Sequence, residues 1–486
     1  MSFAKPPDQS VRGVGVRRNK RGEAHKANKY LQTIQLAYMN KRTFIKLSSA
    51  AMAGIVLSPG MSFAQTDDRL TNWAGNLTFS TSKVATPTSV EDVRSFITSH
   101  DKFKVLGTRH CFNNIADSTD QLLQLNQLPA DILINAAART VTVAGAVKYG
   151  VLADYLNKQG WALHNLASLP HISVAGSTAT ATHGSGIHNG NLSSAVAALE
   201  FITAAGETVT LSRSTNGDAF LGAVVHLGAI GVVTKVTLDI QPTYQVRQDV
   251  YENLALSQLE HGFDAIMGAG YSVSLFTDWT NKNFSEVWIK SRMDKPVNLP
   301  AHFYGATPAT KNLHPIVALS AENCTEQMGV PGPWHERLPH FKMGFTPSSG
   351  KELQTEYFVP REHAYQAIAA VEKLHEQITP HLFITEIRTI DADNFWMSPC
   401  YKQPSATIHF TWKQEWPEVS KLLPQIEAVL EPFNAKPHWG KLFTTSHTRL
   451  KKLYGDRFTA FQKMVKQYDP NGKFTNEFLA RNIWGV

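Results

Sequence analysis

One stretch of small residues restricts the folds open to this chain more than any other feature. Residues 173–186 read Ser-Val-Ala-Gly-Ser-Thr-Ala-Thr-Ala-Thr-His-Gly-Ser-Gly and contain nothing bulkier than one histidine and one valine. Such a segment lets the backbone approach a ligand closely, and its N–H groups can face a pyrophosphate without a lysine or arginine. A strip of small residues packed inside a β-sheet explains the pattern equally well. His183, taken alone, is typical of a structural histidine.

The length and hydropathy of the chain favour a soluble protein with more than one core. A chain of 486 residues is too long for one ordinary core, which favours two domains after a short leader. Its composition, 43% hydrophobic and 18% charged, is that of a globular protein. No apolar run reaches the roughly 18 residues that a spanning helix needs, so we expect no stable membrane span.

The basic character of the chain is confined to its leader. The net charge is +7, and residues 1–68 alone hold 11 Lys and Arg against 4 Asp and Glu. Residues 69–486 carry 36 charges of each sign. A nucleic-acid-binding surface therefore has no electrostatic support in the mature region, and we expect no nucleic-acid partner.

The leader has the three parts of a secretory signal. Residues 39–46 (Met-Asn-Lys-Arg-Thr-Phe-Ile-Lys) are basic, residues 47–57 are apolar and short, and Ser-Phe-Ala precedes Gln65 as a cleavage site. The Lys-Arg-x-Phe-Ile-Lys run also resembles a relaxed twin-arginine signal, the export route for proteins already folded around a cofactor. We expect a true start at Met39 and export to the periplasm. The alternative is a basic tail that stays attached to a cytoplasmic protein.

The sequence lacks the motifs of several familiar frameworks. Cys111, Cys324 and Cys400 are too few for a disulfide framework. The mature region has no C-x-x-C, H-E-x-x-H, Walker A or G-x-G-x-x-G sequence. Neither a Rossmann-type dinucleotide fold nor a bound metal is therefore expected.

The mature chain opens as a mixture of helices and strands. Thr88-x-x-Glu91 after Pro87 predicts a capping box and a helix through Ile97. Around Pro242 the pattern gives way to a region richer in Trp, Phe and Pro, which we take as a domain boundary. Spacing further predicts a helix over residues 149–159, a hairpin of residues 199–202 and 208–211, and strands at residues 103–106, 140–143 and 231–238.

Later in the chain, polar pairs interrupt two apolar runs. Glu386 and Arg388 point to the same face of one predicted strand, and His409 and Thr411 share a face of another. Such groups need partners or a cavity, so they predict either a binding site or a Glu–Arg pair on a solvated face. Lys441, set among aromatic residues, belongs to such a site or is a snorkelling surface lysine.

Three segments carry a specific resemblance to a known family. They are residues 107–113 (Gly-Thr-Arg-His-Cys-Phe-Asn), 166–176 (Leu-Ala-Ser-Leu-Pro-His-Ile-Ser-Val-Ala-Gly) and 181–186 (Ala-Thr-His-Gly-Ser-Gly). Together they resemble the flavin domain of the alditol and xylitol oxidases, which belong to the vanillyl-alcohol-oxidase type of flavoprotein. The likeness covers about residues 70–486 and includes residues 271–279, 329–337 and 472–476.

The resemblance implies an α+β fold, with a vanillyl-alcohol-oxidase type (PCMH-type) FAD-binding domain and a second α+β substrate or cap domain. FAD is the implied cofactor, attached covalently to His110 through an 8α link. Some relatives have Ser where this chain has Cys111, and we expect little effect. The implied segments are a leader and signal peptide (1–64), the FAD-binding domain (69–241), the substrate domain (242–435) and a C-terminal segment returning to the flavin site (436–486).

Family positions that contact the cofactor or substrate carry over residue by residue. The further cofactor positions are Val105, Leu106, Gly107, Thr108, Arg109, Cys111, Ser168, Ser173, Gly176, Ala179, Thr180, Ala181, Thr182, His183, Val233 and His438. The polyol positions are Ser168, Glu386, Arg388, Thr411 and Lys441, with His409 beside them. Lys441, Arg388, Glu386 and His409 form the implied catalytic set. Lys441 is expected to steer the C1 hydroxyl, as a base or as an electrostatic stabiliser.

The implied reaction oxidises the C1 hydroxyl of an alditol such as xylitol or sorbitol to the aldose. A hydride passes to flavin N5, and dioxygen reoxidises the flavin to give hydrogen peroxide. A linear polyol offers only hydroxyls, so its pocket must both accept hydrogen bonds from them and donate hydrogen bonds to them. Glu386 can accept from two hydroxyls, while Arg388 and Lys441 can donate. A small polyol and O2 are then the partners, and a monomer is favoured.

Two other functions fit parts of the sequence. An aldonolactone oxidase or dehydrogenase of the same flavin fold shares part of the Glu386, Arg388 and Lys441 set. A non-catalytic exported carbohydrate-binding protein suits the leader and the tryptophans. Such a binding protein has no use for a flavin-linking histidine, which disfavours it.

The signal-peptide interpretation predicts the N-terminus of the exported protein. Protein secreted by its native host should begin near Gln65, because the apolar stretch ends there in small residues that signal peptidases accept. N-terminal sequencing of the exported form measures this directly. An intact Met1 or Met39 in exported protein would overturn the interpretation.

Overall fold

The structure, a computed structural model, describes residues 69–295, 298–344 and 351–486. The predicted signal, its cleavage site before Gln65 and the alternative start at Met39 lie outside the described residues. Within the described part of the chain, no helix combines the length and hydropathy needed to cross a bilayer.

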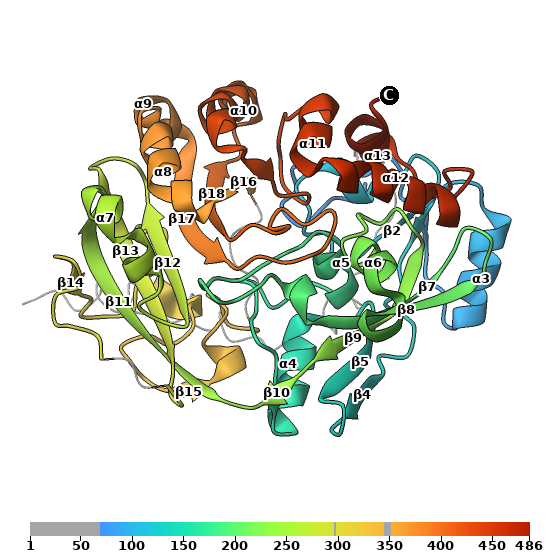
Figure 1. Cartoon of the computed structure of the whole chain (residues 1–486), viewed down its shortest axis with the longest axis horizontal. Coiled ribbons are helices and arrows are strands. Elements are labelled where there is room, and N and C mark those ends of the chain that lie inside the picture. The colour runs from blue at the N-terminus through green and yellow to red at the C-terminus, as the bar shows by residue number, and fades with distance from the viewer. Residues whose placement is uncertain (1–68, 296–297, 345–350) are drawn as a thin grey trace, which may run out of the picture. The chain divides into compact units, whose positions relative to one another are not determined.

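A five-stranded antiparallel sheet forms the scaffold of the first region (Figure 1). In β5 the alternation places the fully buried Val141 and Val143 on one face and threonines on the other. The predicted hairpin and the predicted strands at residues 140–143 and 231–238 are confirmed. In spatial order the strands are β4 (Ile132–Asn135), β5 (Thr140–Ala144), β9 (Val232–Asp239), β7 (Val196–Ile202) and β8 (Thr208–Ser212).

Three short parallel strands flank the loop that carries His110. They pair in the order β1 (Val84–Ala85), β3 (Leu122–Leu123) and β2 (Lys104–Val105), and the loop follows β2. Strand β2 is shorter than the predicted strand at residues 103–106. Arg109 has a left-handed φ of 64°, a conformation that turns the chain directly before His110.

The first described helix, α3 (Val90–Ser99), starts in a different frame from the one predicted. Its capping box joins Ser89 and Asp92, so the predicted pair Thr88 and Glu91 is wrong. The Asp92 carboxylate accepts from the N–H groups of Ser89 and Thr88 and from the Thr88 hydroxyl. Two overlapping cap frames exist in the sequence, and the chain uses the one in which Asp92 accepts from three donors. The predicted helix at residues 149–159 is confirmed as α4 (Tyr149–Lys158).

The small-residue stretch is not a strip inside a sheet. Residues Val174–Ala179 form the short helix α5, and the chain then runs as an irregular segment through His183. Gly107 and Gly176 both approach the Ser173 hydroxyl, since an added Cβ would lie 3.0 Å and 2.9 Å from its oxygen. The stretch therefore lets the backbone lie close to the loop before His110.

A nine-stranded antiparallel sheet dominates the rest of the chain (Figure 1). Its order is β14 (Thr307–Pro308), β11 (Gln245–Ala255), β13 (Asn283–Arg292), β12 (Ser272–Thr277), β17 (Leu382–Ile390), β18 (Ser405–Lys413), β16 (Glu352–Pro360) and β19 (Lys436–Pro437), with β15 (Gly332–Pro333) beside β11. The preceding short strand β10 (Gln241–Pro242) pairs instead with β6 (Trp161–Ala162). The two large sheets thus come from different parts of the sequence.

The central strands of this sheet have one apolar and one polar face. In β18 the fully buried Ile408, Phe410 and Trp412 alternate with His409 and Thr411. The Tyr357 hydroxyl on β16 donates to Glu427 of the covering helix α10 (Trp416–Leu430). Helices α7 (Leu259–Met267), α8 (Ala364–Glu372) and α10 lie along the sheet (Figure 1). The polar face is therefore turned away from α10.

Hydrogen bonds join the C-terminal segment to the loop around His110. The Phe112 N–H donates to the Gly440 carbonyl over 2.8 Å, and the Asn113 amide donates to the Lys441 carbonyl over 2.6 Å. Further along, the Asn476 amide donates to three carbonyls of residues 114–117. The closing helices are α11 (His447–Tyr454), α12 (Asp456–Tyr468) and α13 (Glu477–Leu479).

Candidate active site

A cavity of about 710 Å³ extends from the His110 loop to the polar face of the nine-stranded sheet. Its size lies within the range of small-molecule and cofactor pockets. Every predicted site residue lines it except Ala181. Ala181 is 1% exposed, and its left-handed φ of 53° accompanies a side chain packed into the hydrophobic core. Its predicted contact with the cofactor stays a prediction.

Strand register places three titratable side chains in one row on the cavity wall. His409 of β18 lies directly opposite Glu356 of β16 on one side and Glu386 of β17 on the other. Opposed residues of antiparallel strands project from the same face. Arg388 follows two residues after Glu386 and shares that face. The predicted alternative of a Glu–Arg pair on a solvated face is wrong, because both side chains are 5% exposed.

The buried Glu356 carboxylate is the hub of the ion network. Its Oε2 lies 2.6 Å from Lys441 Nζ, and its Oε1 lies 3.0 Å from Arg388 Nη2. His183 Nε2 is 3.2 Å from the same Oε1. Burial disfavours the charged carboxylate, but Lys441, His183 and Arg388 outweigh it and hold the pKa of Glu356 well below its usual range. Lys441 is thereby an anchored cation whose side chain is only 13% exposed, and not a snorkelling surface lysine.

The second carboxylate, Glu386, meets a different set of partners. Its Oε1 accepts from His340 Nε2 over 2.8 Å, and its Oε2 lies 3.5 Å from Arg388 Nε. Burial raises its pKa, while Arg388 and His340 lower it more, so the group is ionised. Because His340 already takes one oxygen, Glu386 has less capacity for substrate hydroxyls than the sequence suggested.

Several buried polar atoms on this wall make no hydrogen bond among the described residues, although Arg388 Nε and His409 Nδ1 lie 3.5 Å and 3.8 Å from Glu386 Oε2. They are both ring nitrogens of His409 and Nε of Arg388. Burial lowers the pKa of His409 to about 4, which keeps its ring neutral at neutral pH. Ser168 joins the same wall, with its hydroxyl 3.4 Å from Arg388 Nη1. Unpartnered buried polar atoms are costly, so this wall suits a ligand rich in hydrogen-bonding groups.

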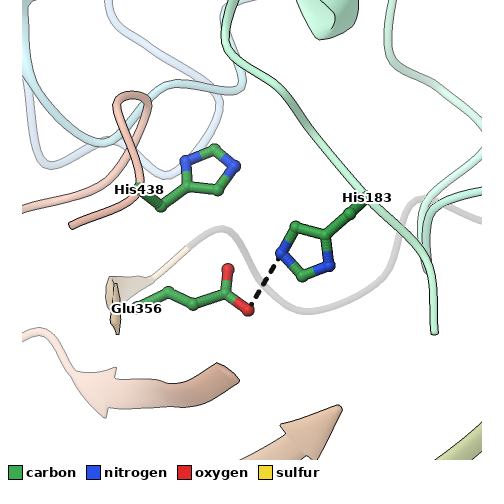
Figure 2. Close-up of side chains that lie close together, drawn as sticks. All are labelled: His183, Glu356 and His438. Carbon is green, nitrogen blue, oxygen red and sulfur yellow. Dashed lines mark ion pairs between the residues drawn. The ribbon is translucent and has the colours of Figure 1, made fainter. Parts of the chain in front are cut away.

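His183, Glu356 and His438 form a cluster of metal-ligand type at the centre of the network (Figure 2). One donor atom from each lies within 4.8 Å of the others. Both Glu356 oxygens, however, already accept from cations, Lys441 and Arg388. A divalent ion here would lie beside two positive charges, so we assign the cluster to the ion network.

His438 presents a defined tautomer. The Gly440 N–H donates to His438 Nδ1 over 3.0 Å, so Nδ1 is an acceptor and the proton of the neutral ring sits on Nε2. Burial lowers the pKa of His438 well below its usual range, and Lys441 adds to the effect. The ring therefore stays a neutral donor at the cavity wall.

His110 has the surroundings expected of a group that meets a cofactor. Its Nδ1 lies 3.2 Å from the Thr108 carbonyl, while its Nε2 is buried without a partner among the described residues. Trp73 stacks on the ring with centroids 5.1 Å apart. Burial lowers the pKa of His110 to about 4, so the ring is neutral. Together with the close approach of Gly107 and Gly176 to Ser173, this orphaned nitrogen fits a bound flavin.

Comparisons with known proteins agree with this geometry. The FAD binding domain family matches residues 81–212, and the D-arabinono-1,4-lactone oxidase family matches residues 346–482. An alditol oxidase of Streptomyces sp. is 45% identical over 413 residues, which are 84% of this chain and 98% of that protein. This chain belongs to the alditol oxidase family of FAD-dependent oxidoreductases. An L-gulono-1,4-lactone dehydrogenase of Mycobacterium tuberculosis is 26% identical over 84% of this chain and 98% of its own length.

Solved structures support the same fold. The crystal structure of cholesterol oxidase from B. sterolicum matches with a TM-score of 0.69, covering 89% of this chain and all of that one at 14% identity. With the FAD-binding family match, this confirms the predicted α+β fold of the vanillyl-alcohol-oxidase type. Membership of the alditol oxidase family also makes the protein an FAD-binding enzyme.

Sequence reasoning missed Glu356 and His340. The signal for Glu356 was present, since Glu352, Gln354 and Glu356 alternate with Leu353, Thr355 and Tyr357 in the pattern that revealed Glu386 and Arg388. His340 carried no such signal, because it lies in an irregular segment whose position depends on tertiary contacts.

The hub role of Glu356 predicts a large loss of stability on substitution. Glu356→Gln removes the charge that compensates two buried cations, and breaking a buried ion pair costs about 3–5 kcal/mol. The thermal unfolding midpoint of the FAD-loaded protein should fall markedly. Glu418→Gln, which breaks an exposed pair with Lys421, is the matched control and should change it little. Equal midpoints for the two variants would contradict the hub role.

Proposed function

We propose that this enzyme oxidises the C1 hydroxyl of an alditol such as xylitol or sorbitol to the aldose, with FAD bound covalently through His110. The observation that carries the proposal is the wall formed by Glu386, Arg388, His409 and Lys441. It offers acceptors and donors side by side, and its unpartnered atoms call for a hydroxyl-rich ligand. The 45% identical alditol oxidase supports the same substrate class.

The cofactor attachment rests on the state of His110. A neutral ring with an unpartnered buried nitrogen can form a bond to the flavin, whereas an imidazolium cannot. When bound, FAD accepts the hydride that leaves C1 and passes two electrons to dioxygen, which gives hydrogen peroxide.

Charge placement assigns different roles to Lys441 and His409. Glu356 holds the Lys441 ammonium at 2.6 Å, so Lys441 donates to the C1 oxygen and polarises it as an electrostatic stabiliser. His409 is neutral and neither of its ring nitrogens makes a hydrogen bond among the described residues, so we take it as the group that accepts the hydroxyl proton. Arg388 and Glu386 orient the other hydroxyls, with Thr411 and Ser168 at the edge of the same wall.

Aldonolactone oxidation is the second candidate. The lactone oxidase family match covers residues 346–482 and so includes Glu356, Glu386, Arg388 and Lys441. The lactone-converting relative is, however, less similar than the alditol oxidase, at 26% identity. Alditol oxidation therefore takes precedence.

Export to the periplasm before the protein acts is also proposed. The proposal rests on the leader, which carries the whole net charge of the chain ahead of a short apolar stretch. A covalently held flavin suits an exported protein, because the cofactor cannot be lost after export.

Covalent attachment predicts a flavin that survives denaturation. The wild-type protein should retain its flavin through acid precipitation and show a fluorescent band on a denaturing gel. His110→Ala should lose that band and keep at most dissociable FAD. His363→Ala, at a half-exposed histidine that pairs only weakly with Glu362, is the matched control and should keep the band. Complete release of flavin from the wild type would show that no bond to His110 exists.

The substrate wall predicts selective damage to flavin reduction. Glu386→Gln should slow reduction by xylitol about tenfold or more, because a charge-assisted hydrogen bond contributes roughly 1.5–3 kcal/mol. Lys441→Met should slow reduction without loss of flavin, because Lys441 is assigned to the C1 oxygen. Anaerobic stopped-flow mixing with xylitol measures both rates, and Lys421→Met, at an exposed lysine, is the control. Wild-type rates in both site variants would place the polyol site elsewhere.

A further inference from the structure

We propose that Lys290 and His340 are positioning residues that lock Glu386 as a hydrogen-bond acceptor and thereby set the preference of the site for hydroxyl-bearing substrates. The inference deepens the proposed function and rests on it for the identity of the ligand. Its structural core, the tautomer of His340, is independent of any activity.

Lys290 meets three acceptors with its three protons. Its Nζ lies 2.5 Å from the Leu338 carbonyl, 3.1 Å from the Pro339 carbonyl and 3.1 Å from His340 Nδ1. The residue is 1% exposed and does not line the cavity. An ammonium has three donors and no acceptor, so this arrangement uses all of them. Lys290 therefore has its hydrogen-bonded contact with the cavity wall through His340.

The contact with Lys290 decides where His340 carries its proton. Nδ1 accepts from the ammonium, so the single proton of the neutral ring sits on Nε2. Nε2 in turn lies 2.8 Å from Glu386 Oε1 and donates to it. Burial lowers the pKa of His340 to about 4, and Lys290 adds to the effect, so a second proton is absent at neutral pH.

His340 has little freedom to leave this position. Its backbone N–H donates to the Ser168 carbonyl over 3.1 Å, which ties it to the segment at the substrate wall. Its ring packs edge-on against Trp288 and Phe276, with centroids 5.1 Å and 5.7 Å away. The donor is thus pre-organised and needs no reordering when a ligand binds.

The hydrogen bond from His340 to Glu386 determines which ligand groups Glu386 can accept from. With Oε1 bound to His340, Oε2 is the oxygen that remains, 3.5 Å from Arg388 Nε and 3.8 Å from His409 Nδ1. An ionised carboxylate cannot donate, so a ligand group here must carry its own proton, as a hydroxyl does. A ligand without that hydroxyl leaves this buried oxygen short of a hydrogen bond, and sites built around such a bond reject ligands that cannot make it.

Charged and titratable groups surround both Glu386 and Lys290. Glu386 is faced by His340, Arg388 and His409, while Lys290 is faced by His340, Glu386, Arg388 and the Cys324 thiol. Burial lowers the pKa of Lys290 to about 7, with Glu386 opposing the shift. Below that pH Lys290 therefore stays protonated and keeps its hydrogen bond to His340 Nδ1.

Nitrogen NMR of histidine-labelled enzyme tests the tautomer without substrate. The His340 signals, assigned by their loss in His340→Gln, should show a bare Nδ1 and a protonated Nε2 below pH 7. A proton on Nδ1 would overturn the proposal.

Kinetics test the consequence for specificity. Wild type, His340→Gln and His340→Leu are compared with xylitol and with monodeoxy pentitols below pH 7. Glutamine keeps a neutral donor that can reach Glu386, so it should retain the preference for xylitol. Leucine removes the donor and should raise the KM for xylitol about tenfold, which corresponds to the loss of one charge-assisted hydrogen bond. It should also reduce the ratio of kcat/KM for xylitol to kcat/KM for the deoxy pentitol that the wild type uses least well. His363→Leu is the control.

Each failure has a distinct signature. A wild type that oxidises no polyol refutes the proposed function, whereas the NMR result still decides the tautomer. If the wild type is active, and fully flavinylated His340→Leu has the same KM for xylitol and the same preference for xylitol over the deoxy pentitols, the positioning role is refuted. If His340→Leu does not fold, Lys290→Met replaces it in the test. This substitution lies outside the cavity and removes the ammonium that fixes the His340 tautomer, so it should also reduce the preference for xylitol over the deoxy pentitols.

Discussion

The pairing of one buried carboxylate with two cations holds the catalytic half of this molecule together. Glu356 comes from β16, Arg388 from β17 and Lys441 from the segment after β19, so their convergence fixes three parts of the chain against one another. None of these charges would be tolerated alone in the interior. The segment that carries Lys441 is also hydrogen-bonded to Phe112 and Asn113, so the same contacts place the substrate wall next to His110.

The electrostatic balance of the wall explains the kind of ligand that it suits. Two carboxylates, Glu356 and Glu386, face two cations, Arg388 and Lys441, and the histidines beside them are kept neutral by burial. A neutral molecule with many hydroxyls satisfies such a wall without bringing an uncompensated charge into the interior. Specificity then depends on which lone pairs and protons remain free, and the contacts behind Glu386 decide that.

Sequence reasoning reached the parts of the site that local patterns encode. Alternation revealed the shared faces of Glu386 with Arg388 and of His409 with Thr411, and the family resemblance located His110. Glu356 was missed although the same alternation marks it, because an alternating strand does not say which neighbours it will meet. His340 lies beyond local patterns, since its role arises from Lys290, 50 residues away in sequence. The α3 cap was mispredicted because overlapping cap frames are settled by detailed geometry.

The central claim is that this neutral, hydroxyl-satisfying wall belongs to an enzyme that reduces its flavin with alditols. Anaerobic addition of xylitol to the purified wild-type protein, followed by admission of air, tests it most directly. The account predicts that the yellow flavin absorbance bleaches with xylitol faster than with an aldonolactone at equal concentration, and that it returns with hydrogen peroxide once air enters. A flavin that stays oxidised with every alditol but bleaches with the aldonolactone would contradict the account.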